Sequence, residues 1–156
     1  MSLDFNMLRE LDGIIVAFEQ AGIRYALAGG FAVAVYGRIR ATRDVDFLCH
    51  PDDVSRASDC LKEAGYKMFA EPWTFRGTPI RLHRFMKPGP EPEWEQVVDL
   101  LVPPADRVHW ILEAERVGWG EQGKVSVVSR PYLIEMKKLR DSDTDRGDIE
   151  FLERGR

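Results

Sequence analysis

Two aspartates, Asp44 and Asp46, stand one residue apart in an apolar run that ends at Cys49. The run is typical of a buried β-strand, in which residues two apart point to the same side, so both carboxylates face the same way. Two like charges side by side repel each other unless a cation lies between them. Carboxylate oxygens suit Mg²⁺ or Mn²⁺, and Mg²⁺ takes its further ligands from water and substrate phosphates. The pair therefore predicts a divalent-metal site.

Gly29 and Gly30 lie between a short apolar run, residues 24–28, and an alanine-rich segment, residues 31–36. A glycine pair between a strand and a helix lets a ligand approach the backbone, and it leaves the first N–H groups of the helix available to an anion. Taken alone, such a pair is more often a plain turn. Followed along the chain by two aspartates, it predicts a seat for phosphates.

The segment between the glycines and the aspartates contains Arg38, Arg40 and Arg43. In an extended strand, Arg40 and Thr42 would point to the same side as Asp44. A solvated loop is the alternative interpretation, because surface charges usually do nothing specific. Nucleotidyl transfer needs a phosphate seat, a metal held by carboxylates, and cationic groups near the developing charge. The residues predicted to bind phosphates are Gly29, Gly30, Arg40, Thr42 and Arg43.

A third carboxylate, Asp99, stands inside the apolar run Gln96–Val102. A lone buried carboxylate costs several kcal/mol unless it is paired or binds metal. A strand edge or a salt bridge is the alternative explanation. Nucleotidyl transfer commonly uses two metal ions about 3.5–4 Å apart, and a third carboxylate can hold them or act as the base for the attacking hydroxyl. We predict Asp44, Asp46 and Asp99 as metal ligands and catalytic residues.

Elements that would position these residues can be predicted from periodicity and turn residues. Strands are expected at residues 24–28, 44–49, 66–69, 79–86, 96–102 and 124–128. Helices are expected at residues 5–21, 31–36, 51–64, 106–117, 131–139 and 145–152. Strands interleaved with helices favour a mixed α/β or α+β fold, with a small mixed β-sheet flanked by helices and a short C-terminal helical segment.

The length of 156 residues predicts one domain over residues 1–156, with a core at about 23–128 and C-terminal helices at about 131–154. The chain is 44% hydrophobic and 31% charged, which is ordinary for a globular protein. Its formal net charge of -4 excludes a general nucleic-acid coat protein, because such binding requires an excess of Lys and Arg.

Cellular location is also constrained by the sequence. Cys49 and Cys60 have no metal-ligand spacing, and two reduced thiols in a cytosolic protein are the simpler interpretation than one disulfide. The first residues lack the pattern of a secretory signal, and no apolar stretch is long enough to cross a bilayer. We therefore expect a cytoplasmic protein with no membrane contact.

The run of residues 26–49 resembles the DNA polymerase β-type nucleotidyltransferase superfamily. That superfamily carries a Gly-Gly or Gly-Ser pair that opens a helix, then Asp-x-Asp on the next strand, then a third acid on a later strand. Gly29-Gly30, Asp44-x-Asp46 and Asp99 match in this order. The resemblance is strongest to small bacterial and archaeal members, including the nucleotidyltransferase toxins of abortive-infection systems. Those proteins carry an Arg-x-Thr-x-Asp-x-Asp run, which here is Arg40, Thr42, Asp44 and Asp46.

The tail of the chain resembles the same group, and the resemblance spans about residues 23–152. The group has a Leu-Ile-x-x-Lys helix followed by Gly-Arg-Pro-Lys-Asp-x-x-Asp. The matching residues are Leu133, Ile134, Lys137, Asp145 and Asp148, whereas residues 141–144 depart from the pattern. The resemblance implies that Lys137 reaches a phosphate, although Lys137 and Lys138 also suit a helix C-terminus for its charge alone. For Asp145, as an N-cap, and for Asp148, in a first turn, we favour structural roles.

By resemblance, the chain is a metal-dependent nucleotidyltransferase that moves a nucleoside monophosphate from an NTP, such as ATP, to a hydroxyl and releases pyrophosphate. The acceptor is open between a protein, a tRNA and a small molecule. The chain is short, so a protein partner or a homodimer could complete the site. The alternative is a catalytically inactive nucleotide- or partner-binding module of the same fold, for example a toxin–antitoxin component. Among the aromatic residues, Trp73 in a predicted loop is the best candidate to contact nucleotide or acceptor.

Overall fold

The computed structural model describes residues 5–39, 44–74, 77–89, 91, 95–121, 123–140 and 142–155. Its strands are β1 (Tyr25–Ala28), β2 (Asp44–Cys49), β3 (Lys67–Met68), β4 (Trp73–Thr74), β5 (Arg81–Lys87), β6 (Gln96–Val102), β7 (Glu115–Trp119) and β8 (Gly123–Val127). Its α-helices are α1 (Phe5–Ala21), α2 (Gly29–Val35), α3 (Val54–Glu63), α4 (His109–Leu112), α5 (Arg130–Arg140) and α6 (Asp143–Arg154). Short 3₁₀ turns, η1 (Pro51–Asp53) and η3 (Ala105–Arg107), precede α3 and α4.

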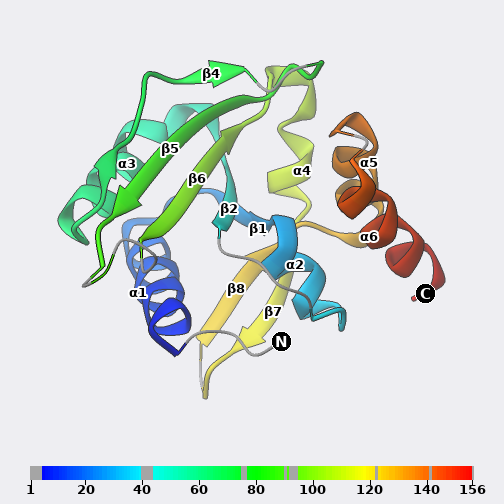
Figure 1. The fold of residues 1–156 in the computed structure, drawn as a ribbon, viewed down its shortest axis with the longest axis horizontal. Helices are drawn as coiled ribbons and strands as arrows, with labels where there is room; N and C mark the ends of the chain where they lie inside the picture. The colour runs from blue at the N-terminus through cyan, green and yellow to red at the C-terminus, as the bar shows by residue number, and fades with distance from the viewer. Residues whose placement is uncertain are drawn as a thin grey trace.

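The strands form one mixed sheet with the order β3-β5-β6-β2-β1-β8-β7, and β4 pairs with β5 (Figure 1). Two neighbouring pairs are parallel, β2 with β6 and β1 with β8, and the others are antiparallel. The predicted class, a small mixed sheet flanked by helices, is confirmed. Strand β2 lies between β1 and β6, so the segment that carries Asp44 and Asp46 is paired on both sides.

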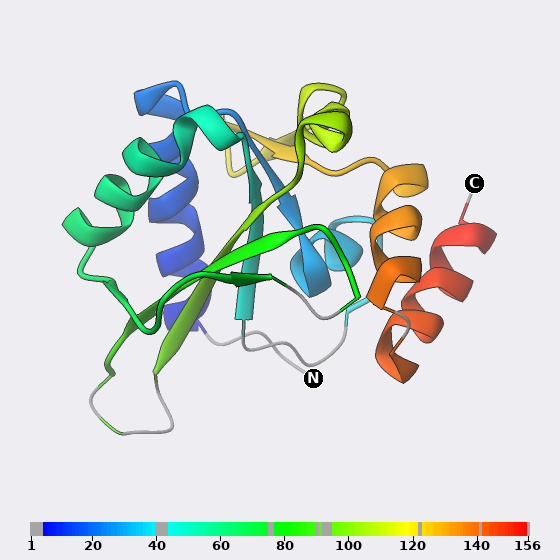
Figure 2. The same cartoon turned by 90° about the horizontal axis from the view of Figure 1, so that it is seen from above.

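Helices α1 and α3 pack side by side against one face of the sheet (Figure 2). Phe18 of α1 meets Phe47 of β2 edge to face, with ring centroids 5.2 Å apart, and Phe47 is fully buried. Because side chains alternate along a strand, Asp46 points to the opposite face. One face of the central strands is therefore filled by core residues, and the other carries the aspartates.

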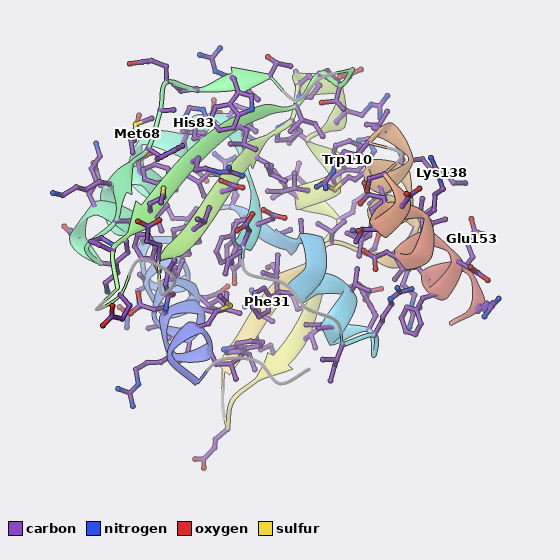
Figure 3. The ribbon with its side chains drawn as sticks, viewed as in Figure 1. Phe31, Met68, His83, Trp110, Lys138 and Glu153 are labelled. Atoms are coloured by element: carbon purple, nitrogen blue, oxygen red, sulfur yellow. The ribbon has the colours of Figure 1, made fainter. Side chains whose placement is uncertain are left out.

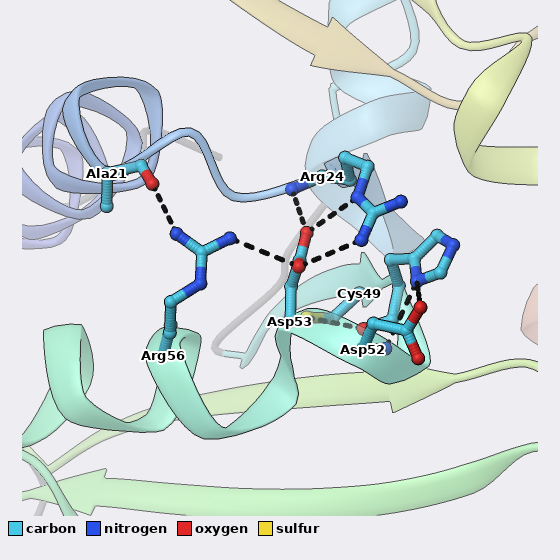
Figure 4. Close-up of polar contacts among 7 residues, drawn as sticks. Ala21, Arg24, Cys49, Asp52, Asp53 and Arg56 are labelled. Carbon is cyan, nitrogen blue, oxygen red and sulfur yellow. Dashed lines mark hydrogen bonds and ion pairs between the residues drawn. The ribbon is translucent and has the colours of Figure 1, made fainter.

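Asp53 fastens the start of α3 to the turn before β1 (Figure 4). Its carboxylate accepts hydrogen bonds from the backbone N–H of Arg24 at 2.8 Å, from Arg24 Nε at 2.9 Å and from Arg24 Nη2 at 3.0 Å. Arg56 Nη2 donates a further bond at 3.1 Å. These bonds, those from the Arg24 side chain above all, hold the pKa of Asp53 well below its usual range. They fix the end of the sheet where β1 begins and β2 ends.

Helices α5 and α6 pack as a pair beyond α2 (Figures 1 and 2). Between them lies a buried charge cluster in which Lys137 Nζ is 3.1 Å from Asp148 Oδ2 and 3.6 Å from Asp145 Oδ1. Arg140 Nε is 3.3 Å from Asp145 Oδ2, and Arg38 Nε, on the segment after α2, is 3.4 Å from Asp148 Oδ1. The cluster ties both helices to each other and to the end of α2.

Asp145 and Asp148 have structural roles, but the positions predicted for them at the helix start are both wrong. Helix α6 begins at Asp143, so Asp148 lies beyond its first turn, and Asp145 is not the N-cap. The N-cap of α6 is Ser142, whose hydroxyl accepts a hydrogen bond from the Asp145 backbone N–H at 3.0 Å. In return, the Asp145 carboxylate accepts a hydrogen bond from the Ser142 backbone N–H at 3.3 Å, so Asp145 is the N3 residue of a capping box and not the N-cap itself.

The predicted helix at 106–117 is wrong in its second half. Residues 109–112 form a short α4, but Glu115–Trp119 is the strand β7, which pairs antiparallel with β8. Gly120, with φ 66°, begins the turn between them, and a hairpin with this turn satisfies the backbone better than a helix containing Gly118. Trp73, predicted in a loop, is instead on the short strand β4. Among the described residues, no helix is long and apolar enough to span a membrane.

Candidate active site

Three charged residues lie in one row across the sheet. In the parallel pair of β2 and β6, Asp46 is the register partner of Asp99, and in the antiparallel pair of β5 and β6, Asp99 is the partner of Arg84. On the other side of Asp46 the row continues to Ala28, the last residue of β1. Far apart in the sequence, the predicted Asp46 and Asp99 are thus neighbours in the fold.

Gly29 begins α2 directly after β1, so the predicted order of strand, glycine pair and helix is present. Gly29 has φ 63°, a conformation that favours glycine. A Cβ at this position would lie 3.0 Å from Cγ and 3.1 Å from Cβ of Asp46, and closer still to Oδ2. The first turn of α2 therefore lies directly against the Asp46 carboxylate, and only glycine fits there.

Asp46 carries a charge that its surroundings oppose. Burial, the charge of Asp99 and the charge of Asp44 raise the pKa of Asp46 to about 7, although Arg140 and Lys137 act in the other direction. Among the described residues, no side chain donates a hydrogen bond to its carboxylate. A carboxylate in this condition is either protonated or neutralised by a cation that binds to it.

Asp99, in contrast, has a cationic partner for both of its carboxylate oxygens. Arg84 Nε donates to Asp99 Oδ1 at 2.9 Å, and Arg84 Nη2 donates to Asp99 Oδ2 at 2.9 Å. The Asp99 side chain is 3% exposed and that of Arg84 30%. Arg84 Nη2 also lies 3.9 Å from Asp44 Oδ2, and its Cζ lies 5.5 Å from the centre of the Trp73 ring. Arg84 thus binds two of the three predicted acids.

Sequence reasoning missed Arg84. The available signal was that Arg84 is a charged residue in the apolar part of a predicted strand. Leu82 and Phe85, which stand on either side of it in the sequence, are both fully buried. Its partner depends on the register between β5 and β6, which a local pattern does not give. Trp73 pairs with Leu82 across β4 and β5, which places Trp73 beside Arg84 on the same face as the acids.

Helix α5 covers the end of the row next to Gly29. A small cavity of about 20 Å³ lies there, enough for one water molecule. Its lining residues are Gly29, Asp46, Ile80, Leu101, Leu133, Met136, Lys137 and Arg140. Lys137 therefore faces the same space as Asp46, but its ammonium is paired with Asp145 and Asp148. Its contact with a phosphate stays a prediction.

Three of the predicted phosphate-binding residues, Arg40, Thr42 and Arg43, lie outside the described residues. Gly30 follows Gly29 in the first turn of α2 and is buried. The binding of phosphates by this turn is also a prediction.

The three acids meet only some of the requirements of a divalent-metal site. Asp44 and Asp46 stand two apart on β2 with Asp46 uncompensated, which is what an ion would relieve. Both oxygens of Asp99 are held by Arg84, and in the described part of the chain no three acidic, histidine or cysteine side chains are arranged to hold a metal ion. The arrangement thus suits one ion at Asp44 and Asp46, and it does not suit a cluster of all three acids.

Several solved structures share this fold. The lincosamide antibiotic adenylyltransferase LnuA, solved with lincomycin bound, is 18% identical with a TM-score of 0.63, and the match covers 93% of this chain and 95% of that one. The enzyme ANT(2'')-Ia, solved with adenylyl-2''-tobramycin, is 14% identical with a TM-score of 0.63, covering 94% and 87%. A Thermotoga maritima protein described as a nucleotidyltransferase is 14% identical with a TM-score of 0.64, covering 94% of both chains.

At these identities the solved structures establish the fold alone. No protein of curated function matches the sequence. The sequence profile of the family described as uncharacterised nucleotidyltransferases matches residues 2–119, most of the chain, and this protein therefore belongs to that nucleotidyltransferase family.

Proposed function

We propose that this protein transfers a nucleoside monophosphate from an NTP to a hydroxyl group of an acceptor, with release of pyrophosphate and with Mg²⁺ or Mn²⁺. The observation that carries the proposal is the position of Asp46. Its uncompensated carboxylate lies against the glycine that opens α2 and beside Asp99, where a cation and a triphosphate would meet.

Each part of the site has a task in this reaction. Asp44 and Asp46 would hold the ion, which when bound polarises the phosphoryl group under attack. The first N–H groups of α2 would face the phosphates, because the first turn of a helix leaves its donors without internal partners. Arg140, which lines the same cavity as Asp46, would add positive charge near the leaving pyrophosphate.

The acceptor we favour is a small molecule with hydroxyl groups. LnuA and ANT(2'')-Ia, whose fold this chain shares, are described with lincomycin and with adenylylated tobramycin. Trp73 is 37% exposed on the face that carries the acids, and its ring offers a flat apolar surface to such a molecule. A protein or a tRNA remains the alternative acceptor. We also propose, as the sequence leads us to expect, that the chain is a single domain and that the protein is cytoplasmic.

The test is a transfer assay with α-³²P-labelled NTPs, each with Mg²⁺ or Mn²⁺. Acceptors are hydroxyl-bearing antibiotics, a tRNA pool and purified proteins. We expect label on one acceptor class, and a loss of at least about 100-fold in Asp46→Asn, because a catalytic metal ion is worth several kcal/mol. Asp59→Asn, an exposed acid of α3, is the matched control and should keep full activity. Equal labelling by wild type and Asp46→Asn would sink the proposal.

A second candidate is a module of the same fold that binds nucleotide or a protein partner without turnover, as in a toxin–antitoxin pair. The pairing of Asp99 with Arg84 favours it, because Asp99 is then poorly placed to act as base. This candidate predicts binding of an NTP that is unaffected by the acceptor panel, with no labelled product from wild type.

A further inference from the structure

The positively charged guanidinium of Arg84 lies in the part of the sheet that carries the three predicted acids. It forms two hydrogen bonds to Asp99 at 2.9 Å each and lies 3.9 Å from Asp44. The position is set by the backbone, because Arg84 and Asp99 are register partners in the longest strand pair of the sheet. The fold itself therefore places Arg84 in the site, before any ligand binds.

The charge of Asp99 is already balanced by a protein cation in this arrangement. Each of its oxygens accepts one bond from the guanidinium, and the side chain is 3% exposed, so Asp99 is buried as an ion pair that needs no metal ion for neutrality. Bidentate charged pairs of this kind are strong and fixed in direction. The ring of Trp73, 5.5 Å from Cζ, closes another side of the guanidinium.

Asp46 presents the opposite case, since no described side chain donates to it. The site thus contains one acid already neutralised by a protein cation and one that still needs a cation. A second metal ion at Asp99 would stand directly beside the Arg84 guanidinium, and the two positive charges would repel each other.

We propose that Arg84 takes the place of a second metal ion, so that this nucleotidyltransferase binds a single divalent ion with its nucleotide, at Asp44 and Asp46. The inference rests on the proposed function, because it assumes a metal–NTP complex. It gives Arg84 the task of neutralising Asp99 and Asp44 permanently, at a fixed position beside the reacting groups.

The test is the number of Mn²⁺ ions bound per chain, counted by the loss of the free-ion signal in electron paramagnetic resonance. Protein and an α,β-methylene NTP analogue are mixed in equal amounts, and analogues of all four nucleotides are used. We expect one ion per complex for wild type and for Arg84→Lys, which keeps a cation. Arg84→Met should bind two. Arg81→Met, on the same strand and exposed, is the control and should bind one.

Each outcome decides the matter. Two ions in wild type overturn the inference and leave the proposed function intact. One ion in a folded Arg84→Met also overturns it, because the vacated position should accept an ion. If Arg84→Met does not fold, the wild-type count decides alone. Absence of both ion and analogue from wild type removes the proposed function, and the inference with it.

Discussion

Gly29 and Asp46 are in such close contact that the glycine has no room for a side chain. A methyl group on Gly29 would come within 3.0 Å of Cγ of Asp46. The residue that opens α2 and the acid at the centre of the row are therefore packed against each other, and a side chain at position 29 would displace Asp46.

Gly29→Ala should lower both stability and nucleotide transfer, because the new methyl pushes Asp46 out of the row. Gly22→Ala is the matched control, since Gly22 has nearly the same φ, 65°, but nothing within 4 Å of an added Cβ. The control should cost about 1–2 kcal/mol from backbone conformation alone. Urea denaturation should show a larger loss for Gly29→Ala, and an equal loss in the two variants would contradict the contact.

Asp46→Asn should make the metal-free protein more stable at pH 8. The pKa of Asp46 is raised from 3.8 to about 7, so the folded state binds more protons and wild-type stability falls as pH rises from about 4 to 7. The amide does not ionise, and we expect a gain of about 1–3 kcal/mol at pH 8 after allowing for solvent screening.

This gain is measured by thermal unfolding in EDTA between pH 4 and pH 8.5. It should shrink toward zero at the acidic end, where Asp46 is protonated in both states. Asp59→Asn should show no such trend, because Asp59 is exposed. A pH-independent difference between Asp46→Asn and wild type would rule out the unfavourable charge.

Lys137→Met should destabilise the protein by about 1.5–3 kcal/mol, because it removes the cation that Asp145 and Asp148 share and leaves them Arg140 and Arg38 as partners. Lys138→Met is the neighbouring control. Lys138 pairs with Glu153 at 3.6 Å on the exposed surface of α5 and α6, and such pairs contribute about 0–1 kcal/mol (Figure 3). Chemical denaturation of both variants tests this, and similar losses would show that the buried cluster contributes little.

Asp53→Asn should cost about 1.5–3 kcal/mol at pH 7, the range for hydrogen bonds to a charged group. The pKa of Asp53 is lowered by the Arg24 bonds, so its contribution is fully present above the unfolded value near 4 and is lost as pH falls below it. The difference between wild type and variant should therefore shrink in acid. Asp52→Asn, whose side chain is exposed, should be close to neutral at all pH values.

Local patterns were sufficient for the first part of the site. The order of strand, glycine pair and helix at Gly29, and the shared face of Asp44 and Asp46, follow from spacing alone. The cost of a lone buried carboxylate singled out Asp99, and the resemblance to a known family supported its place beside Asp46, but the parallel pairing of β2 with β6 cannot be read from either segment.

The rest of the site depends on tertiary pairing. Arg84 reaches Asp99 only in one register of β5 against β6, and a shift by one residue would point it to the core. The same reason explains the error at β7, where pairing with β8 overrides a helical spacing. Lys137 matched a family motif, but its neutralisation by two acids of α6 required the packing of the last two helices.

The place of β2 in the sheet also sets the order in which the protein can assemble. Strands β1 and β2 are near each other in the chain and can pair early, whereas β6 must be synthesised before the second edge of β2 is covered. Such long-range parallel pairing is slow to form. A nascent chain that ends before β6 would hold Asp44 and Asp46 on an open strand edge, with Asp99 not yet made and Arg84 not yet fixed beside them. The pairing of β6 and the completion of the charged row are therefore one folding event.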